Sequence, residues 1–293
     1  MTSIFFAMGS TFTFATASLY FAEFSKKLSP VWMNYFKACI AFLCFVLTIL
    51  IFQIPITINS GGVLLLVLSG VTGLMIGDIF LMSAFAHLGS GRVLMIFGFQ
   101  PLILGVASYF LFNETFEWHR LVAVIFFVMC IASFSLESFK EKGDWELKGI
   151  FFGVAGVFLD ACGVLMTKKA FESNADLSPF VANAIRSGAT MFGFFLVSLL
   201  IPKIIQLKAP FLTLTAREKK LAVGASALGG FVALACYLNA IRYGHLATIS
   251  AIAGTSPLFA TVFEIIKGRK KMTKYLGFAI VSFVIGFVIL FNH

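Results

Sequence analysis

Charged residues are scarce in this sequence. Of its 293 residues, 12% are Asp, Glu, Lys or Arg, and 60% are hydrophobic. A soluble domain carries about a quarter charged residues, because its surface must face water. Aromatic residues make up 16% of the chain, which is not typical of a disordered protein. The composition therefore excludes a soluble enzyme, a soluble nucleic-acid-binding protein and a disordered linker, and it indicates an integral membrane protein.

Motifs for catalysis and metal binding are also missing. The sequence has no HExxH, GxSxG, P-loop or Asp-rich metal motif. Its five cysteines have no CxxC spacing, so they predict neither a disulfide framework nor a zinc site. Two aspartates in apolar stretches suggest an intramembrane aspartyl protease, but the segment before Gly77-Asp78 lacks the first glycine of a GxGD motif. We expect no catalytic residue, cofactor or metal site, and predict that the protein is not an enzyme.

Long apolar stretches are abundant instead. A membrane-spanning helix needs about 20 mainly apolar residues. Ten stretches satisfy this requirement, near residues 4–24, 30–53, 62–86, 92–112, 118–137, 149–168, 178–201, 221–243, 246–266 and 274–291. We therefore predict an all-α polytopic membrane protein with ten transmembrane helices and no soluble domain.

The two halves of the sequence repeat one another. A Leu-Ser-Pro triplet opens the second stretch at residues 28–30 and the seventh at 177–179. Ala84 precedes Pro101 by 17 positions, and Ala240 precedes Pro257 by the same 17. Pro55 and Pro202 close the second and seventh stretches, so six of the seven prolines pair between the halves. The offset is 149 at the Leu-Ser-Pro triplets and 156 at Pro101 and Pro257, because the loop after the seventh stretch is longer. Such pairing indicates an internal duplication.

Each repeat contains five helices, so the second must enter the bilayer from the opposite face. Inverted repeats are common in secondary transporters, whose substrate sites lie near the midplane between the halves. We predict a first repeat over residues 1–140 and an inverted second repeat over 141–293, around a central cavity.

Four charged residues lie well away from the ends of the apolar stretches, where charge is costly and marks a pathway or an ion pair. Their depths along the helices allow a Lys37–Asp78 pair and, in the other leaflet, an Arg186–Asp160 pair. In the functional interpretation, the basic groups bind the substrate's carboxylate or phosphate, and an aspartate exchanges a proton. In the structural alternative, the pairs only neutralise themselves, or the basic residues extend to the interface.

Other polar groups and two prolines complete the candidate site. The further substrate-binding candidates are Asn34, Gln100, Asn183, Tyr237 and Asn239; alternatively, each of them hydrogen-bonds a neighbouring helix. Pro101 and Pro257 lie near the middle of their stretches, where proline kinks a helix. These kinks are either tolerated or act as hinges for gating.

The arrangement of these features resembles the EamA-like family of the drug/metabolite transporter superfamily. The matching residues are Lys37, Ala84, Pro101, Glu114, Arg186, Ala240 and Pro257. The resemblance spans nearly the whole chain and implies a bundle of ten helices with inverted repeats, in the bacterial inner membrane. Members move amino acids, other metabolites, nucleotide derivatives or drugs. The sequence departs from the family pattern at Lys37, where arginine is commoner, and at Lys270, where glutamate is frequent.

The distribution of basic residues and the resemblance disagree about orientation. Most basic residues outside the stretches lie in the loops after the odd-numbered stretches. The positive-inside rule places those loops in the cytoplasm and both termini outside, whereas the resemblance implies cytoplasmic termini. We favour the charge distribution.

We expect a secondary transporter of small polar metabolites such as amino acids or related carboxylates, with export as the favoured direction, working by alternating access. Its partners are the lipid bilayer and a small-molecule substrate, not nucleic acid, and it is a monomer or homodimer with a proton as candidate coupling ion. The alternatives are transport of nucleotide-derived or drug-like solutes, a lipid-headgroup flippase and a non-transporting membrane scaffold.

Overall fold

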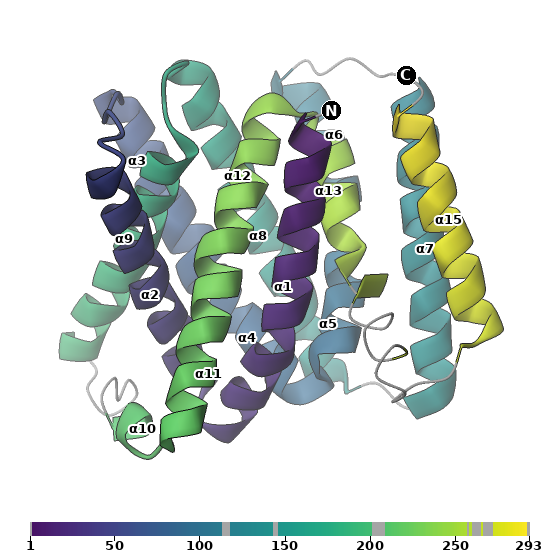
Figure 1. Ribbon diagram of the computed structural model, residues 1–293, viewed down its shortest axis with the longest axis horizontal. Helices are drawn as coiled ribbons and strands as arrows, with labels where there is room; N and C mark the ends of the chain where they lie inside the picture. Colours follow the sequence, from purple (N-terminus) through teal and green to yellow (C-terminus); the bar gives the residue numbers. More distant parts are fainter. Residues whose placement is uncertain are drawn as a thin grey trace.

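The computed structural model describes residues 2–112, 118–142, 146–200, 209–256, 258–259, 265 and 272–291. The described residues form a bundle of helices without a β-strand, and both termini lie at the same end (Figure 1). In the first half the helices are α1 (Thr2–Lys27), α2 (Pro30–Ile51), α3 (Ser60–Ser69), η1 (Gly70–Gly77), α4 (Asp78–Leu88), α5 (Ser90–Phe97), α6 (Gln100–Phe112) and α7 (Trp118–Lys142). In the second half they are α8 (Leu147–Ser173), α9 (Pro179–Leu200), α10 (Ala209–Leu212), α11 (Ala216–Ser226), η2 (Ala227–Val232), α12 (Ala233–Tyr243), α13 (Leu246–Gly254) and α15 (Lys274–Phe291).

Six helical segments of the described part are long and apolar enough to cross a membrane. They are Thr2–Lys27, Pro30–Ile51, Ser60–Leu88, Leu147–Ser173, Pro179–Leu200 and Ala216–Tyr243. Shorter apolar helices cover Ile103–Phe112, Leu121–Cys130 and Lys274–Gly286. Each stretch predicted from the sequence overlaps a helix, and large apolar side chains such as Phe52 and Leu200 cover the outside of the bundle.

The repeated Leu-Ser-Pro triplet starts a helix in the same way in both halves. At α2, the Ser29 hydroxyl accepts a hydrogen bond from the Trp32 amide at 2.9 Å, and Pro30 occupies the first helical turn. At α9, the Ser178 hydroxyl accepts from the Phe180 amide at 3.3 Å, and Pro179 begins the helix. Serine satisfies an amide that has no partner in the first turn, and proline has no amide to satisfy.

A π-helical segment interrupts the third predicted stretch and the eighth at matching positions. The first, η1, covers Gly70–Gly77, and the second, η2, covers Ala227–Val232. The offset of 156 that pairs Pro101 with Pro257 also brings these two segments into register. Both halves therefore place the same irregularity at equivalent positions. π-Helical turns are rare and occur often at functional sites.

The sequence suggested that the fourth predicted stretch is one helix kinked at Pro101, but the structure divides it into two helices. Helix α5 ends at Phe97, and α6 begins anew at Gln100, which places Pro101 in the first turn of α6. Proline cannot donate a hydrogen bond in a helix interior but is accommodated in a first turn, so the chain breaks immediately before it. In the second half, α13 likewise ends at Gly254. Pro257 itself lies outside the described residues.

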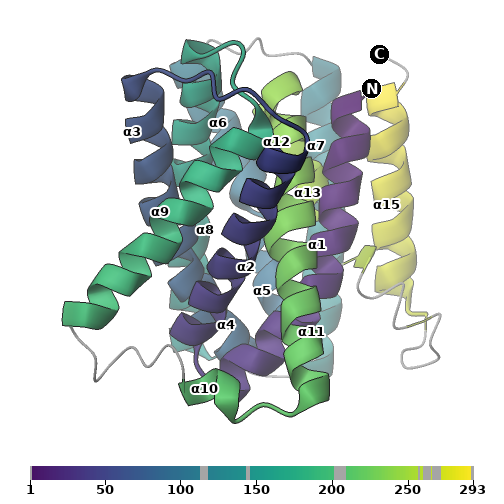
Figure 2. The ribbon, with the colours of Figure 1, turned by 60° about the vertical axis from the view of Figure 1, so that its left-hand side comes forward.

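The two halves pack against each other reciprocally. Helix α1 packs against α12, and α8, its counterpart in the second half, packs against η1 and α4. The segment η1 contacts α9, just as η2 contacts α2. Gly73 and Gly163 let η1 and α8 approach closely, since a Cβ at Gly163 would lie 3.1 Å from the Gly73 Cα. Figure 2 shows α2, α9, α8 and α12 arranged together, with α15 at the edge of the bundle beside α7.

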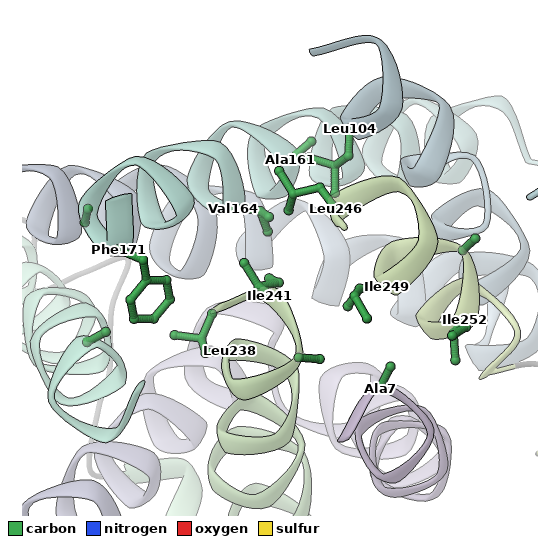
Figure 3. Packing of buried hydrophobic residues seen from close by; sticks show 14 of the residues in the cluster. Ala7, Leu104, Ala161, Val164, Phe171, Leu238, Ile241, Leu246, Ile249 and Ile252 are labelled. Carbon is green, nitrogen blue, oxygen red and sulfur yellow. The ribbon is translucent and has the colours of Figure 1, made fainter. Parts of the chain in front are cut away.

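Apolar side chains from both halves form the largest buried cluster of the described residues. Leu104 of α6, Val164 of α8, Ile241 of α12 and Ile249 of α13 all belong to it (Figure 3). Because lipid is as apolar as leucine, close packing rather than escape from water holds such helices together. The cluster joins several of the helices whose polar residues line the cavity described next, among them α1, α6, α8 and α12.

Candidate functional site

A cavity lies between the two halves of the chain, with a volume of about 90 Å³. A site needs roughly 10–15 Å³ to hold one water molecule, so this cavity has room for several waters or a small solute. Six of the predicted site residues line it: Lys37, Asp78, Gln100, Asp160, Arg186 and Tyr237. Ser10, Thr11 and Ser256 add hydroxyl groups, and the remaining lining is mainly apolar. Sequence analysis had not singled out these hydroxyl groups.

The predicted ion pair between Lys37 and Asp78 is present. The Lys37 ammonium, on α2, donates to Asp78 Oδ2, where η1 meets α4. Both side chains are buried, with 7% of each exposed. A carboxylate so placed would be very unfavourable alone, but its charge is neutralised by the ammonium. The pair thus closes on itself while lining the cavity.

The predicted pair between Arg186 and Asp160 is absent. Among the described residues, no ion pair joins these two side chains within 4.0 Å. Asp160 Oδ2 instead accepts a hydrogen bond from the Gln100 side-chain amide at 2.6 Å, and Arg186 Nε donates to the Ser69 hydroxyl at 3.0 Å. Depth along a helix does not determine the direction in which a side chain points, and the packing provides each charged group with a nearer, neutral partner.

Among the described residues that line the cavity, two buried polar atoms have no hydrogen-bond partner. They are Arg186 Nη1 and the hydroxyl oxygen of Tyr237. A buried polar group without a partner costs about 1–3 kcal/mol, and such groups call for an explanation such as water or a ligand. Both groups are hydrogen-bond donors, so an anionic or carbonyl oxygen in the cavity would satisfy them.

The three candidate asparagines are not part of the cavity lining. Asn34 donates to the backbone carbonyls of Leu74 and Met75 at 2.8 and 3.0 Å. Asn183 donates to the carbonyl of Leu234 at 3.1 Å, so each buried amide ties its helix to another helical segment of the same half, α2 to η1 and α9 to α12. These contacts are of the kind that joins helices within a membrane.

Asn239 and Pro101 are also not among the residues that line the cavity. The Asn239 side chain donates to the Ala235 carbonyl of its own helix at 2.8 Å. Pro101 is buried directly beside Gln100, at the break between α5 and α6. It therefore fixes where the helix that carries Gln100 begins.

Equivalent positions of the two halves line the cavity with different chemistry. Leu234 lies 156 positions after Asp78, and Ser256 lies 156 positions after Gln100; all four line the cavity. The offset from the paired prolines could have identified Leu234 and Ser256. No sequence signal identifies Ser69, which is a single serine in an apolar run.

Comparison with known proteins agrees with this architecture. The EamA-like transporter family matches residues 1–136 and 147–292. None of the curated proteins compared with the chain matches it. A crystal structure of another protein superposes with a TM-score of 0.73 at 14% sequence identity, covering 97% of this chain and 94% of that one; at this identity the likeness shows the fold alone. Two matched segments that together span nearly the whole sequence show that the chain belongs to the EamA-like transporter family and is an integral membrane transporter.

Proposed function

We propose that the protein is a secondary transporter of amino acids or related carboxylates, and that it binds them in the cavity between its halves. The observation that carries this proposal is the state of Arg186. Its Nε is held by a neutral hydroxyl group, and its Nη1 has no partner at the wall of the cavity. A guanidinium group in this state is suited to binding a carboxylate through paired hydrogen bonds.

The charges of the cavity support a solute that carries both signs. Lys37 and Asp78 neutralise one another. Asp160 and Arg186 are held by the neutral groups of Gln100 and Ser69, so a negative and a positive charge stay without an opposite charge bonded to them. An α-amino acid would complement both, with its carboxylate at Arg186 and Tyr237 and its ammonium at Asp160. Charges in a low-dielectric cavity act strongly on such a solute.

The proposal includes the arrangement in the membrane. Ten transmembrane helices in two inverted repeats, residues 1–140 and 141–293, are supported by the two family matches and by the matched π-helical segments. We place the protein in a bacterial inner membrane, with export by alternating access as the direction of transport.

Counterflow into liposomes tests the function. Purified protein is reconstituted into vesicles loaded with amino acids, nucleotide derivatives or organic cations, and uptake of the labelled solute is followed. Saturable exchange of a carboxylate solute, lost in Arg186→Ala, supports the proposal. Exchange of other solutes alone contradicts the substrate class. Movement of labelled lipid without any solute exchange would indicate a flippase instead.

Proton coupling is expected to depend on the two aspartates of the cavity. Asparagine has nearly the same shape as aspartate but cannot take up a proton, so Asp78→Asn combined with Asp160→Asn should abolish accumulation driven by a pH gradient. The measurement is uptake with and without an imposed pH gradient. The control variant is Glu218→Gln, because Glu218 is an acidic residue in the first turn of α11. If the pH gradient does not change wild-type uptake, or if the double variant still accumulates solute in response to the gradient as the wild type does, these aspartates carry no proton.

The paired helix breaks are proposed as gating hinges. In Pro101→Ala, the chain regains the amide that proline lacks, so α5 and α6 can join into a more rigid helix. We expect exchange to slow several-fold while substrate affinity stays unchanged, as measured by stopped-flow exchange and by calorimetric titration. Pro30→Ala, at the start of α2, is the matched control. A Pro101→Ala exchange rate equal to that of the wild type would remove the hinge from the mechanism.

A further inference from the structure

Ser69 is the centre of a buried hydrogen-bonded cluster. It ends α3 and is fully buried, and its hydroxyl donates to the Gly163 carbonyl at 2.6 Å. The Thr167 hydroxyl lies 2.8 Å from the Ser69 hydroxyl oxygen, and Arg186 Nε donates a hydrogen bond to that same Ser69 oxygen at 3.0 Å. One small side chain from the first half thus joins α8 and α9 of the second. Because the hydroxyl is itself fixed by Gly163 and Thr167, its acceptor position is fixed as well.

The backbone beside this cluster holds α9 against η1. A Cβ at Gly70 would lie 2.4 Å from the Arg186 carbonyl oxygen, so glycine is required for the two helices to approach this closely. The Thr190 hydroxyl lies 3.0 Å from the carbonyl oxygens of both Gly70 and Arg186. The Arg186 backbone therefore has little freedom, and the direction of its guanidinium group depends on what holds Nε.

The two basic residues of the cavity are held by different chemistry. Lys37 is bonded to a carboxylate, and the position equivalent to that carboxylate in the second half is Leu234. Arg186 is bonded to a hydroxyl, and the position 156 residues after Ser69 is Ala225, which has none. A carboxylate neutralises the cation that it holds, whereas a hydroxyl orients the cation and leaves its charge available.

We propose that Ser69 is a positioning residue that sets the affinity and carboxylate selectivity of the transporter through Arg186. Anchoring Nε fixes the plane of the guanidinium group, so that Nη1, which has no other partner, points its hydrogens at the solute. This inference rests on the proposed function, because it assumes that Arg186 binds the solute's carboxylate.

The test compares a carboxylate solute with its neutral analogue. The probes are the amino acid that exchanges fastest in counterflow and the α-amide of that amino acid. In Ser69→Ala, we expect KM for the amino acid to rise on the order of tenfold, since a hydrogen bond to a charged group is lost. We expect kcat to change little, and the preference for the amino acid over the amide to fall by a similar factor. Ser69→Thr, which keeps the hydroxyl, should restore part of the preference.

Matched variants separate positioning from packing. Thr190→Val removes a hydroxyl from the same helix crossing, but one that contacts only backbone carbonyls and not the guanidinium group, so it should shift the preference by a much smaller factor than Ser69→Ala does. In an Arg186→Lys background, Ser69→Ala should have no further effect, because the residues act together. If Ser69→Ala does not fold, Thr167→Val should shift the preference in the same direction by a smaller factor.

The outcomes distinguish this inference from the proposed function. Wild-type protein that exchanges no amino acid overturns both. Suppose that the wild type exchanges an amino acid and that Arg186→Lys loses the carboxylate preference. An unchanged preference in Ser69→Ala then overturns the inference alone. If Ser69→Ala does not fold, an unchanged preference in Thr167→Val does the same. An equal shift in Thr190→Val and Ser69→Ala would also overturn it, because the effect would then come from packing.

Discussion

Replacing Lys37 with methionine should lower the free energy of unfolding by about 3–5 kcal/mol, because it leaves the Asp78 carboxylate buried without its partner. Replacing both residues, as Lys37→Met with Asp78→Leu, should restore most of that stability, since no buried charge remains. The measurement is unfolding of the purified protein in mixed micelles with a titrated denaturing detergent.

Transport by the double variant separates the two interpretations of the pair. If the pair only neutralises itself, the double variant exchanges solute normally; if it takes part in binding or coupling, exchange is lost although the fold is intact. The Lys27–Glu218 ion pair provides the control: its side chains are 48% and 22% exposed. Lys27→Met should cost less than about 1 kcal/mol. Equal losses for Lys27→Met and Lys37→Met would contradict the burial argument.

The second large effect is expected at Arg186. Arg186→Ala should reduce the kcat/KM of carboxylate exchange on the order of 100-fold, because a partner of a desolvated charge contributes several kcal/mol to binding. Arg186→Lys should recover only part of this loss, since an ammonium group cannot donate two parallel hydrogen bonds and cannot use the Nε contact to Ser69. Concentration-dependent counterflow gives both kinetic constants.

A basic residue outside the cavity serves as the control for this prediction. Lys168 donates to the backbone carbonyls of Ile241 and Gly244 at 3.2 and 3.4 Å and does not line the cavity. Lys168→Met should change stability more than transport. Arg186→Ala protein that folds and exchanges carboxylates as the wild type does would return Arg186 to a structural role and remove the main support for the proposed function.

Some features of the site could be predicted because they follow from position along the chain. The start of α2 follows from Ser29 and Pro30, whose local chemistry begins a helix wherever it occurs. The Lys37–Asp78 pair follows from depth, because two opposite charges at one level of a bilayer are strongly driven to meet. Neither inference needed the arrangement of the other helices.

The remaining features depend on which atoms the packing brings together. Depth also predicted an Arg186–Asp160 pair, but Gln100 and Ser69 are nearer to these groups once the helices have packed. A hydrogen bond requires an approach to about 3 Å and a suitable angle, and rotation of a helix about its axis decides both. The π-helical turns of η1 and η2 change how the following residues are rotated about the helix axis, and the composition of the sequence does not predict these turns.

The sequence alone therefore determined the membrane environment, the helical class, the internal duplication and the set of polar residues inside the apolar stretches, because each depends on composition, segment length or periodicity. Only the tertiary structure decided that six of those residues share one cavity, that Lys37 is neutralised, and that Arg186 keeps its charge beside a serine. The physical reason is that hydrogen bonds and ion pairs depend on distances of a few ångströms between helices, and these distances are set by close packing rather than by the order of residues.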